Sequence, residues 1–180
     1  MLRSLTAMTC AIALATTGCS TMKSKLQSKP KGNEAVITPT AGNSAAGTLM
    51  VTAVPDGVHI QGRLTGLPPG STHGFHIHEH GDCSAPDAST AGGHFNPTRT
   101  EHGDPAGMTH HAGDIANQVA DAQGAIDVDL TVHGVSFDTG ASDDVLGRSL
   151  IVHRDADDYT SQPAGNSGPR IACGVILKKP

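Results

Sequence analysis

The chain has 180 residues, with 12 Lys and Arg against 17 Asp and Glu, which gives a formal net charge of −5. Its aromatic side chains are three Phe and one Tyr, with no Trp. Nucleic-acid binding needs a basic surface and rings for stacking, so this composition argues against a nucleic-acid partner. The 22 Gly and 11 Pro, without a long helix-forming stretch, favour short strands joined by loops in one domain.

Residues 1–18 have the organisation of a bacterial export signal. Arg3 lies near the start, a mainly apolar stretch covers residues 5–15, and small residues precede Cys19. This stretch is well short of the roughly 20 residues that a transmembrane helix needs. Cys19 follows a glycine, as at the cleavage site of bacterial lipoproteins, although Thr16 stands where that pattern prefers leucine. We therefore expect a periplasmic or cell-envelope lipoprotein whose only membrane contact is a lipid on Cys19. The alternative is a soluble exported protein.

Residues 19–45 are predicted to form a flexible tether. They are rich in Lys, Pro, Ser, Gly and Asn, and they carry too few apolar side chains to bury a core. The domain that carries the function is therefore expected to span residues 46–180.

From Gly47 onward the sequence is typical of strands. Val58, Ile60 and Leu64 alternate with polar residues, which is the period of a half-buried strand. This pattern predicts an antiparallel barrel or sandwich, interrupted by a long aperiodic loop. The alternating or fully apolar segments are residues 58–64, 126–132, 150–152 and 171–177, and the loop is residues 79–111.

Histidine is the unusual residue, with 11 in the chain and seven of them between His76 and Asp114. His76 and His78 are two apart in an apolar stretch, so on a strand both imidazoles would project from one face as ligands of one ion. His153 follows another apolar run and adds a further nitrogen. A set of three imidazoles and one carboxylate would suit tetrahedral zinc. Its members are His94, His102, His111 and Asp114.

Other interpretations of these histidines are weaker. His76 and His78 alone could be two surface residues of an edge strand. The segment HIHEHGD is close to the H-x-H-x-D-H motif of binuclear zinc hydrolases, but His80 stands where that motif has aspartate. The H-E-x-x-H pattern of zincins is absent. His110 neighbours His111 and could compete with it as a ligand.

Six separated motifs make the chain similar to the copper/zinc superoxide dismutases. They are GFHIHEHGDC, GGHFNP, HGDP, HHAGDI, LIVHRDADDY and GNSGPRIACGVI, in this order within residues 47–178. The resemblance implies an all-β fold, an eight-stranded antiparallel Greek-key barrel or sandwich with long metal-binding and electrostatic loops. It also implies copper and zinc as cofactors and superoxide as the substrate.

The resemblance further implies two ligand sets that share His94. A four-nitrogen set suits Cu(II), and three nitrogens with one oxygen suit zinc. His94 would bridge the ions and carry a proton during turnover, and the spacing of the family motif favours His111 over His110. The implied copper ligands are His76, His78, His94 and His153, and the implied zinc ligands are His94, His102, His111 and Asp114.

Four more side chains acquire roles by resemblance. Asp157 would accept hydrogen bonds from one copper-site and one zinc-site histidine. Arg170 would lie at the mouth of the copper channel and hold a small anion near the metal. Cys83 and Cys173 would form a disulfide, which export makes plausible, with two reduced core cysteines as the alternative.

The sequence thus predicts an exported antioxidant enzyme that converts superoxide to oxygen and hydrogen peroxide by copper redox cycling, with zinc in a structural role. The alternative is a module of the same fold that binds or delivers copper without turnover. The resemblance leaves open whether the protein is a monomer or a homodimer.

Overall fold

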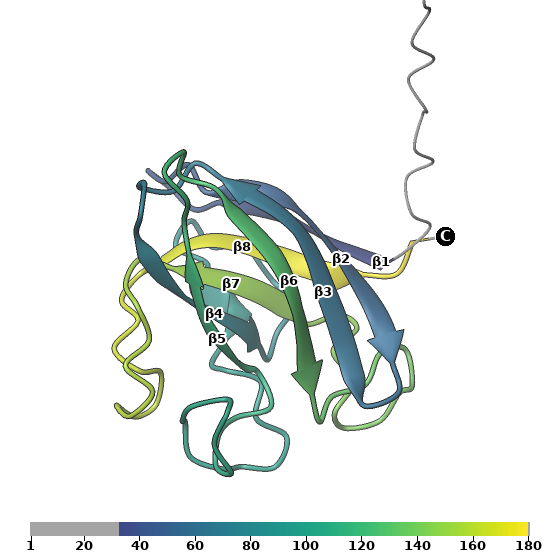
Figure 1. Cartoon of the computed structure of the whole chain (residues 1–180). Helices are drawn as coiled ribbons and strands as arrows, with labels where there is room; N and C mark the ends of the chain where they lie inside the picture. The colour runs from purple at the N-terminus through teal and green to yellow at the C-terminus, as the bar shows by residue number, and fades with distance from the viewer. Residues whose placement is uncertain (1–32, 180) are drawn as a thin grey trace, which may run out of the picture. The chain divides into compact units, whose positions relative to one another are not determined.

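The computed structural model describes residues 33–179, which fold into strands and loops with one short 3₁₀ turn (Figure 1). The turn, η1, spans Ser89–Ala91. The strands are β1 (Asn33–Pro39), β2 (Ala46–Val54), β3 (Gly57–Thr65), β4 (Thr72–His78), β5 (Asp114–Val119), β6 (Ile126–His133), β7 (Ser149–His153) and β8 (Arg170–Leu177).

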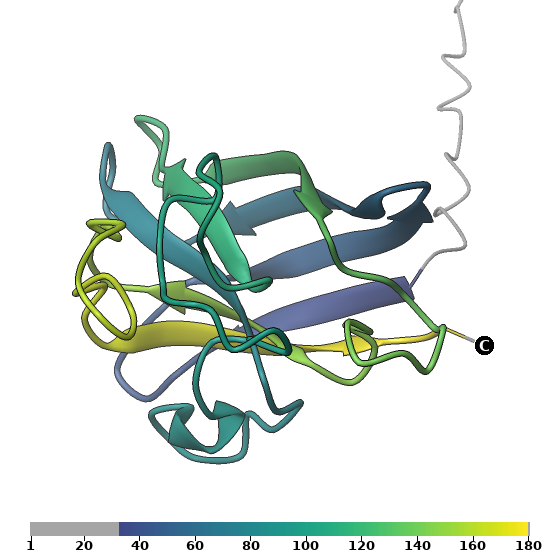
Figure 2. The ribbon, with the colours of Figure 1, turned by 90° about the horizontal axis from the view of Figure 1, so that it is seen from below.

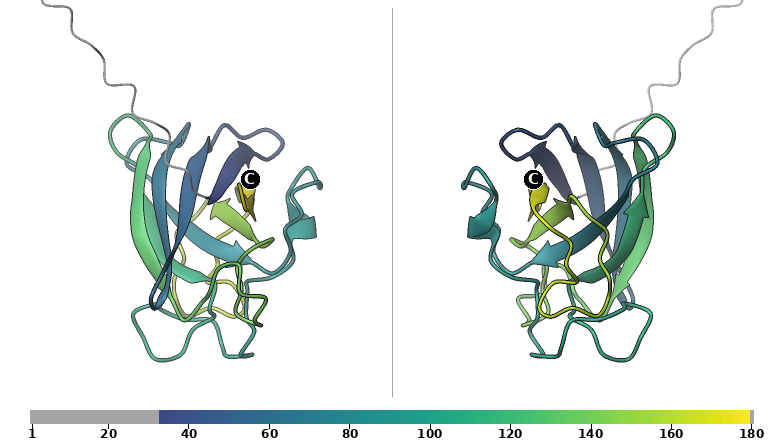
Figure 3. Two further views of the ribbon diagram at one scale, coloured as in Figure 1. Left: turned by 90° about the vertical axis from the view of Figure 1, so that its right-hand side faces the viewer. Right: turned by 90° about the vertical axis from the view of Figure 1, so that its left-hand side faces the viewer.

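The strands form a nearly closed antiparallel barrel. Their order is β5-β4-β7-β8-β1-β2-β3-β6. β3 pairs with β6 rather than with β4, so the chain leaves one side of the barrel after β3 and returns to it for β6, as in a Greek key. The sheet curls until its two ends, β5 and β6, approach each other (Figure 3). The predicted eight-stranded Greek-key barrel is confirmed.

The predicted strand segments are confirmed as well. In β3, Val58, Ile60 and Leu64 are buried while Gln61 and Arg63 are exposed. β6 alternates in the same way, whereas β7 is buried along its whole length. Alternation therefore marks strands with one solvated face, and continuous apolar runs mark strands covered on both faces. The largest buried apolar side chains are Phe75, Ile37, Leu49, Ile60, Leu64, Ile77, Leu150, Ile151 and Ile176.

The predicted extent of the tether is wrong, because residues 33–45 belong to the folded domain. β1 pairs with β2 on one side and with β8 on the other, so it lies inside the sheet. Only Ala35 and Ile37 of this strand are buried in the core, and Val36 points outward. Two inward side chains are too few to produce a recognisable pattern, and the strand is held instead by pairing with its neighbours. The export signal, Cys19 and residues 19–32 lie outside the described residues.

Two long connections gather at one end of the barrel (Figure 2). The first, residues 79–113, joins β4 to β5 and contains the long aperiodic loop expected from the sequence. The second, residues 154–169, joins β7 to β8. A disulfide between Cys83 and Cys173 ties the first loop to β8, with 5.8 Å between the Cα atoms. Among the described residues, no helix is long and apolar enough to cross a membrane.

Candidate metal centre

Neighbouring strands bring three of the predicted ligands together. His76 and His78 lie two apart on β4, and both are buried. β7 runs antiparallel to β4 with Phe75 opposite Val152, so His153 comes at the end of β7 beside the same region. All three histidines are at least 96% buried, with relative exposures of 0%, 1% and 4%.

His94 reaches this place from the 79–113 loop. An isolated β-bridge pairs it with His78, and the next residue, Phe95, donates its backbone N–H to the Ile77 oxygen at 2.8 Å. The imidazoles of His94 and His76 lie with their centroids 3.9 Å apart and their planes tilted by 31°. The loop is therefore held against β4 by the backbone on either side of its histidine.

Two groups of possible ligand atoms result, and His94 belongs to both. In each group the offered atoms lie within 4.8 Å of one another, and every member is buried. The first group contains four imidazoles, and the second contains three imidazoles and one carboxylate. The groups are His76, His78, His94 and His153, and His94, His102, His111 and Asp114.

Asp114 is the centre of the second group. Its Oδ1 accepts a hydrogen bond from His94 Nδ1 at 2.7 Å, and its Oδ2 lies 3.0 Å from His102 Nδ1. Its Oδ1 also lies 3.4 Å from His111 Nδ1. Backbone N–H groups of Gly103 and His111 donate to Oδ2. The carboxylate is thus fixed by the backbone while three imidazoles face it.

Four buried nitrogens have no hydrogen-bond partner among the described residues. They are His76 Nδ1, His94 Nε2, His102 Nδ1 and His111 Nδ1. A buried polar atom without a partner is costly and rare in native proteins. Four such atoms in one place are the expected consequence of a site built for cations, since lone pairs directed at a metal do not accept hydrogen bonds.

The two remaining histidines of the first group, His78 and His153, also direct lone pairs at a place where a cation can bind. The Nδ1 atoms of His78 and His153 donate to the carbonyl oxygens of Gly92 and Gly168, at 3.0 and 3.1 Å. In a neutral imidazole the other nitrogen then carries a lone pair. The two Nε2 atoms lie 3.3 Å apart, so two lone pairs face each other. A cation between them converts this repulsion into attraction, and the residues therefore fit a metal.

Asp157 orients one histidine of each group. Its Oδ2 accepts from His76 Nε2 at 2.7 Å, and its Oδ1 accepts from His102 Nε2 at 3.0 Å. Both donating nitrogens face away from the ligand groups, so Asp157 leaves Nδ1 of each ring free for a metal. The structure thus brings Asp157 into contact with one histidine from each set, which is the arrangement that the resemblance implies.

Burial lowers the pKa of three of the ligand imidazoles. It lowers the pKa of His94 to about 4 and that of His153 to about 3, and the neighbouring imidazoles act in the same direction. The pKa of His78 is also lowered, chiefly by burial. Burial alone raises the pKa of the Asp114 carboxyl, but hydrogen bonds from His111 and His94 outweigh it and the net shift is downward. Neutral imidazoles and an ionised carboxylate are the forms that bind metals.

Arg170, at the start of β8, lies beside the first group. Its guanidinium donates to the carbonyl oxygens of Ala88 and Gly92, at 2.6 and 2.5 Å. The Gly92 oxygen also accepts from His78. One carbonyl of the 79–113 loop therefore holds both a ligand histidine and this arginine.

The remaining histidines lie outside both groups. His73 is buried, and its Nδ1 donates to the His153 oxygen at 2.8 Å, so it packs within the barrel. His110 hydrogen-bonds the His111 carbonyl through Nδ1, and it is His111 that joins the second group. His59, His80 and His133 pair with carboxylates near the surface.

Sequence reasoning missed Asn117 of β5. Its side-chain amide donates to the Asp157 carbonyl and accepts from the Asp157 N–H, both at 2.8 Å, and thereby fixes the main chain of that residue. Its own backbone N–H donates to Tyr159 Oη at 2.7 Å. No local pattern connects two residues that are 40 positions apart, so the sequence contains no signal for this contact.

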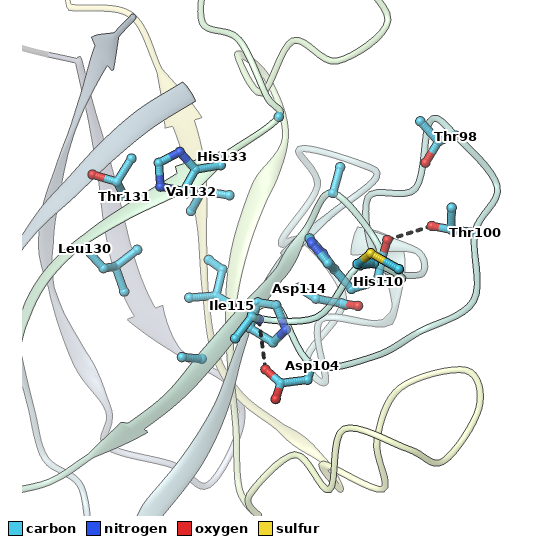
Figure 4. Close-up of a pocket in the computed structure, with 16 residues that line it drawn as sticks. Thr98, Thr100, Asp104, His110, Asp114, Ile115, Leu130, Thr131, Val132 and His133 are labelled. Carbon is cyan, nitrogen blue, oxygen red and sulfur yellow. Dashed lines mark hydrogen bonds between the residues drawn. The ribbon is translucent and has the colours of Figure 1, made fainter. Parts of the chain in front are cut away.

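A separate hollow lies between the loop around Thr98 and Thr100 and the end of β6 (Figure 4). Figure 4 shows His110 and His133 on opposite sides of it. Its walls include Ile115, Leu130 and Val132. Within the described residues its polar side chains form no ligand group apart from Asp114, which belongs to the buried centre.

A Greek-key barrel with two ligand groups that share one histidine defines an all-β protein with a binuclear metal site. The sequence model of the copper/zinc superoxide dismutase (SODC) family matches residues 45–176. The chain therefore belongs to the copper/zinc superoxide dismutase family, an oxidoreductase family that uses copper and zinc.

Individual relatives agree with this membership. The superoxide dismutase-like protein YojM of Bacillus subtilis is 43% identical over 125 residues, which are 68% of this chain and 64% of that protein. The chain thus spans just under two thirds of this relative. Superoxide dismutase [Cu-Zn] 2 of Mesembryanthemum crystallinum is 40% identical over 150 residues, 79% of this chain and 94% of that protein. The crystal structure of a SOD-like protein from Bacillus subtilis is similar with a TM-score of 0.74 and 38% identity, covering 81% of this chain and 99% of that one.

Proposed function

We propose that this chain is an exported superoxide dismutase, which converts two superoxide anions and two protons into oxygen and hydrogen peroxide. The observation that supports this most directly is the shared position of His94. Its Nδ1 is engaged with Asp114 in the second group, and its Nε2 is buried without a partner among the described residues. A single imidazole between two ligand groups couples them, and a site that only stored one metal would not need this coupling.

We assign copper to the group of four nitrogens and zinc to the group with Asp114. Copper, when bound, supplies one-electron redox chemistry, and zinc supplies a fixed charge that does not change oxidation state. Asp157 keeps His76 and His102 in the tautomers that leave Nδ1 free. His94 Nε2 is the atom that we assign to hold and release a proton, because the contact at Nδ1 keeps the ring in place.

Arg170 is assigned to the approach of superoxide. Arginine has no free lone pair at neutral pH, so it does not ligate a metal, but its planar cation attracts small anions. Because the chain carries a net charge of −5, attraction of an anion must come from a local positive group rather than from the whole surface. The two hydrogen bonds to loop carbonyls hold this guanidinium next to His78.

The decisive experiment is to load the purified domain with copper and zinc and to measure superoxide consumption. We expect rapid, catalytic consumption that is lost when the copper is removed. A protein that contains both metals at full occupancy and consumes no superoxide would exclude the enzyme and favour the copper-binding or copper-delivery module.

Arg170→Ile should lower the bimolecular rate constant by about tenfold at low salt, with both metals retained. The deficit should shrink as ionic strength rises, because salt screens the lost charge, and Arg170→Glu should be slower still. Arg63→Ile is the matched control, since it removes the same charge from β3, where Arg63 pairs with Asp121 and Asp127. Equal rates for Arg170→Ile and Arg63→Ile at equal metal content would contradict the assigned role.

We also propose that the protein is exported and anchored to a membrane by a lipid. The disulfide between Cys83 and Cys173 supports an oxidising compartment, since such bonds are rare in the cytosol of mesophiles. We propose that residues 1–18 direct export to the periplasm or cell envelope and that Cys19 carries the lipid. Stable anchoring requires two lipid signals or more. Mass spectrometry of the protein from native membranes should find a lipidated Cys19 at the N-terminus, and a mature chain without Cys19 would contradict this.

A further inference from the structure

The backbone N–H and C=O of His102 are both paired with a side chain rather than with other backbone groups. His102 lies in the 79–113 loop, outside every strand, and among the described residues its N–H and C=O form no backbone hydrogen bond. The residue is nonetheless 97% buried, with a relative exposure of 3%. Buried backbone groups are almost always paired, so these two groups need partners from a side chain.

Gln162 supplies both partners. Its Oε1 accepts from the His102 N–H at 2.9 Å, and its Nε2 donates to the His102 carbonyl at 2.9 Å. Gln162 belongs to the 154–169 loop, which Figure 3 shows beside the 79–113 loop at one end of the barrel. A single side-chain amide therefore joins the two loops through two hydrogen bonds, between residues 60 positions apart in the sequence.

This contact complements that of Asp157. Asp157 Oδ1 accepts from His102 Nε2 and so sets the rotation of the ring. The ring can be directed at a metal only if the main chain that carries it is also fixed. Gln162 fixes that main chain, and the two contacts together determine where His102 Nδ1 lies. This nitrogen is 3.0 Å from Asp114 Oδ2, in the second ligand group.

The 154–169 loop has anchors that do not involve Gln162. Asn117 of β5 forms two hydrogen bonds with the Asp157 main chain, and its N–H donates to Tyr159 Oη. The Asp158 carboxylate accepts from the N–H groups of Thr160 and Ser161 within the loop. The loop should thus stay docked when the Gln162 amide is removed.

We propose that Gln162 is a positioning residue for the zinc-side ligand group and that it acts through the His102 main chain. This inference rests on the proposed function, because it assumes that the group with Asp114 holds zinc. Loss of groups that orient metal ligands typically weakens metal binding by about 10-fold to 100-fold. Removing the Gln162 amide should therefore accelerate zinc release by a factor in this range and leave copper release unchanged, because Gln162 contacts no histidine of the copper group.

The test compares the wild type with Gln162→Met, which keeps the length of the side chain and removes both hydrogen bonds. Gln123→Met is the matched control, since Gln123 is exposed and its side chain forms no hydrogen bond within residues 33–179. Zinc and copper release from the fully loaded proteins to chromogenic chelators is followed separately. Tyr159 reports on the loop, because the chain has one Tyr and no Trp and its emission therefore comes from this residue alone.

We expect Gln162→Met to release zinc about 10-fold to 100-fold faster than both the wild type and Gln123→Met. Copper release and the quenching of Tyr159 emission by acrylamide should match the wild type. Equal zinc release from all three proteins would overturn the inference. Faster zinc release together with more accessible Tyr159 would overturn it as well, since Gln162 would then only keep the loop docked. A wild type that binds no zinc would overturn the proposed function and this inference with it.

Discussion

Two histidine–aspartate pairs in this protein have the same nitrogen–oxygen distance and opposite surroundings. His59 on β3 and Asp129 on β6 lie 2.7 Å apart, with 29% and 80% of their side chains exposed. His76 on β4 and Asp157 also lie 2.7 Å apart, and both side chains are 0% exposed. A distance alone therefore does not define a function. Solvent can replace a lost partner in the first pair, whereas no solvent reaches the second pair, so a group left there without its partner would stay unpaired.

The same contrast separates the two halves of the barrel. β1, β2, β3 and β6 alternate between core and solvent, and β3 and β6 carry surface ion pairs, whose individual contributions to stability are small. β4 and β7 are buried almost throughout, because their ligand histidines lie on the face opposite the core residues Phe75 and Ile77 and are covered there by the 79–113 loop. Burying these ligand rings is tolerated because one nitrogen each of His76, His78 and His153 has a hydrogen-bond acceptor and the rings belong to a ligand group. The metal-binding half therefore needs every one of these hydrogen bonds and ligand atoms, whereas the other half does not depend on any single surface ion pair.

His94→Ala should have the largest effect, because it removes a member of both ligand groups. We expect loss of copper and marked weakening of zinc binding. His153→Ala should mainly affect copper, since His153 belongs to the first group alone. Metal content after dialysis, measured by atomic emission, checks both. Unchanged zinc affinity in His94→Ala would contradict the bridging assignment.

Removing the disulfide should be the largest change in stability. It joins residues 90 positions apart, and closing a loop of this length is worth about 4 to 5 kcal/mol in the chain-entropy model. Cys83→Ser with Cys173→Ser should lower the free energy of unfolding of the metal-free protein by about that amount, as measured in urea. The double variant Ser84→Ala and Ser89→Ala is a control in the same loop. A loss below about 1 kcal/mol would show that the loop is held by its other contacts.

The two histidine–aspartate pairs provide the sharpest comparison. Asp157→Asn should weaken metal binding by about 10-fold to 100-fold, because the amide can serve His76 and His102 with only one acceptor oxygen. Asp129→Asn makes the same change in the exposed pair and should alter the free energy of unfolding by no more than about 0.5 kcal/mol, with normal metal binding. Isothermal titration with zinc and urea unfolding measure the two effects. Similar metal affinities and unfolding free energies for the two variants would contradict the difference between the buried and the exposed pair.

A buried carboxylate outside the metal centre should give a smaller effect than Asp157. Asp144 accepts from the backbone N–H groups of Asp138, Thr139, Gly140 and Leu146. Burial raises its pKa, but these hydrogen bonds outweigh burial and the net shift is downward. Asp144→Asn should cost about 1 kcal/mol at pH 7.

The pH dependence of this effect has a defined sign. The folded pKa of Asp144 is depressed, so the carboxylate contributes its full stabilisation above the ordinary carboxyl value of about 3.9. The contribution is lost as the pH falls from there through the lower folded value. Urea midpoints of the wild type and Asp144→Asn should therefore differ at pH 7 and converge below about pH 4. A difference that grows on acidification would contradict this account.

The sequence alone was sufficient for much of the fold and for the types of ligand. Alternation predicted β3 and β6, and apolar runs predicted β7 and β8, because these patterns are local consequences of burial on one or both faces. The spacing of His76 and His78 on one strand is likewise local. Residue types alone suggested the set with Asp114, but the four-nitrogen set and the sharing of His94, which join β4, β5, β7 and the 79–113 loop, were expected only through the resemblance to a family.

Other features were decided by the tertiary structure. β1 has just two buried side chains, Ala35 and Ile37, so its sequence resembles a tether and only pairing with β2 and β8 makes it a strand. Asn117 and Gln162 each hold the main chain of a site residue 40 or 60 positions away. Local sequence determines which face of a strand is apolar. Which buried backbone group meets which amide depends on how two loops come together, and no short-range pattern encodes that contact.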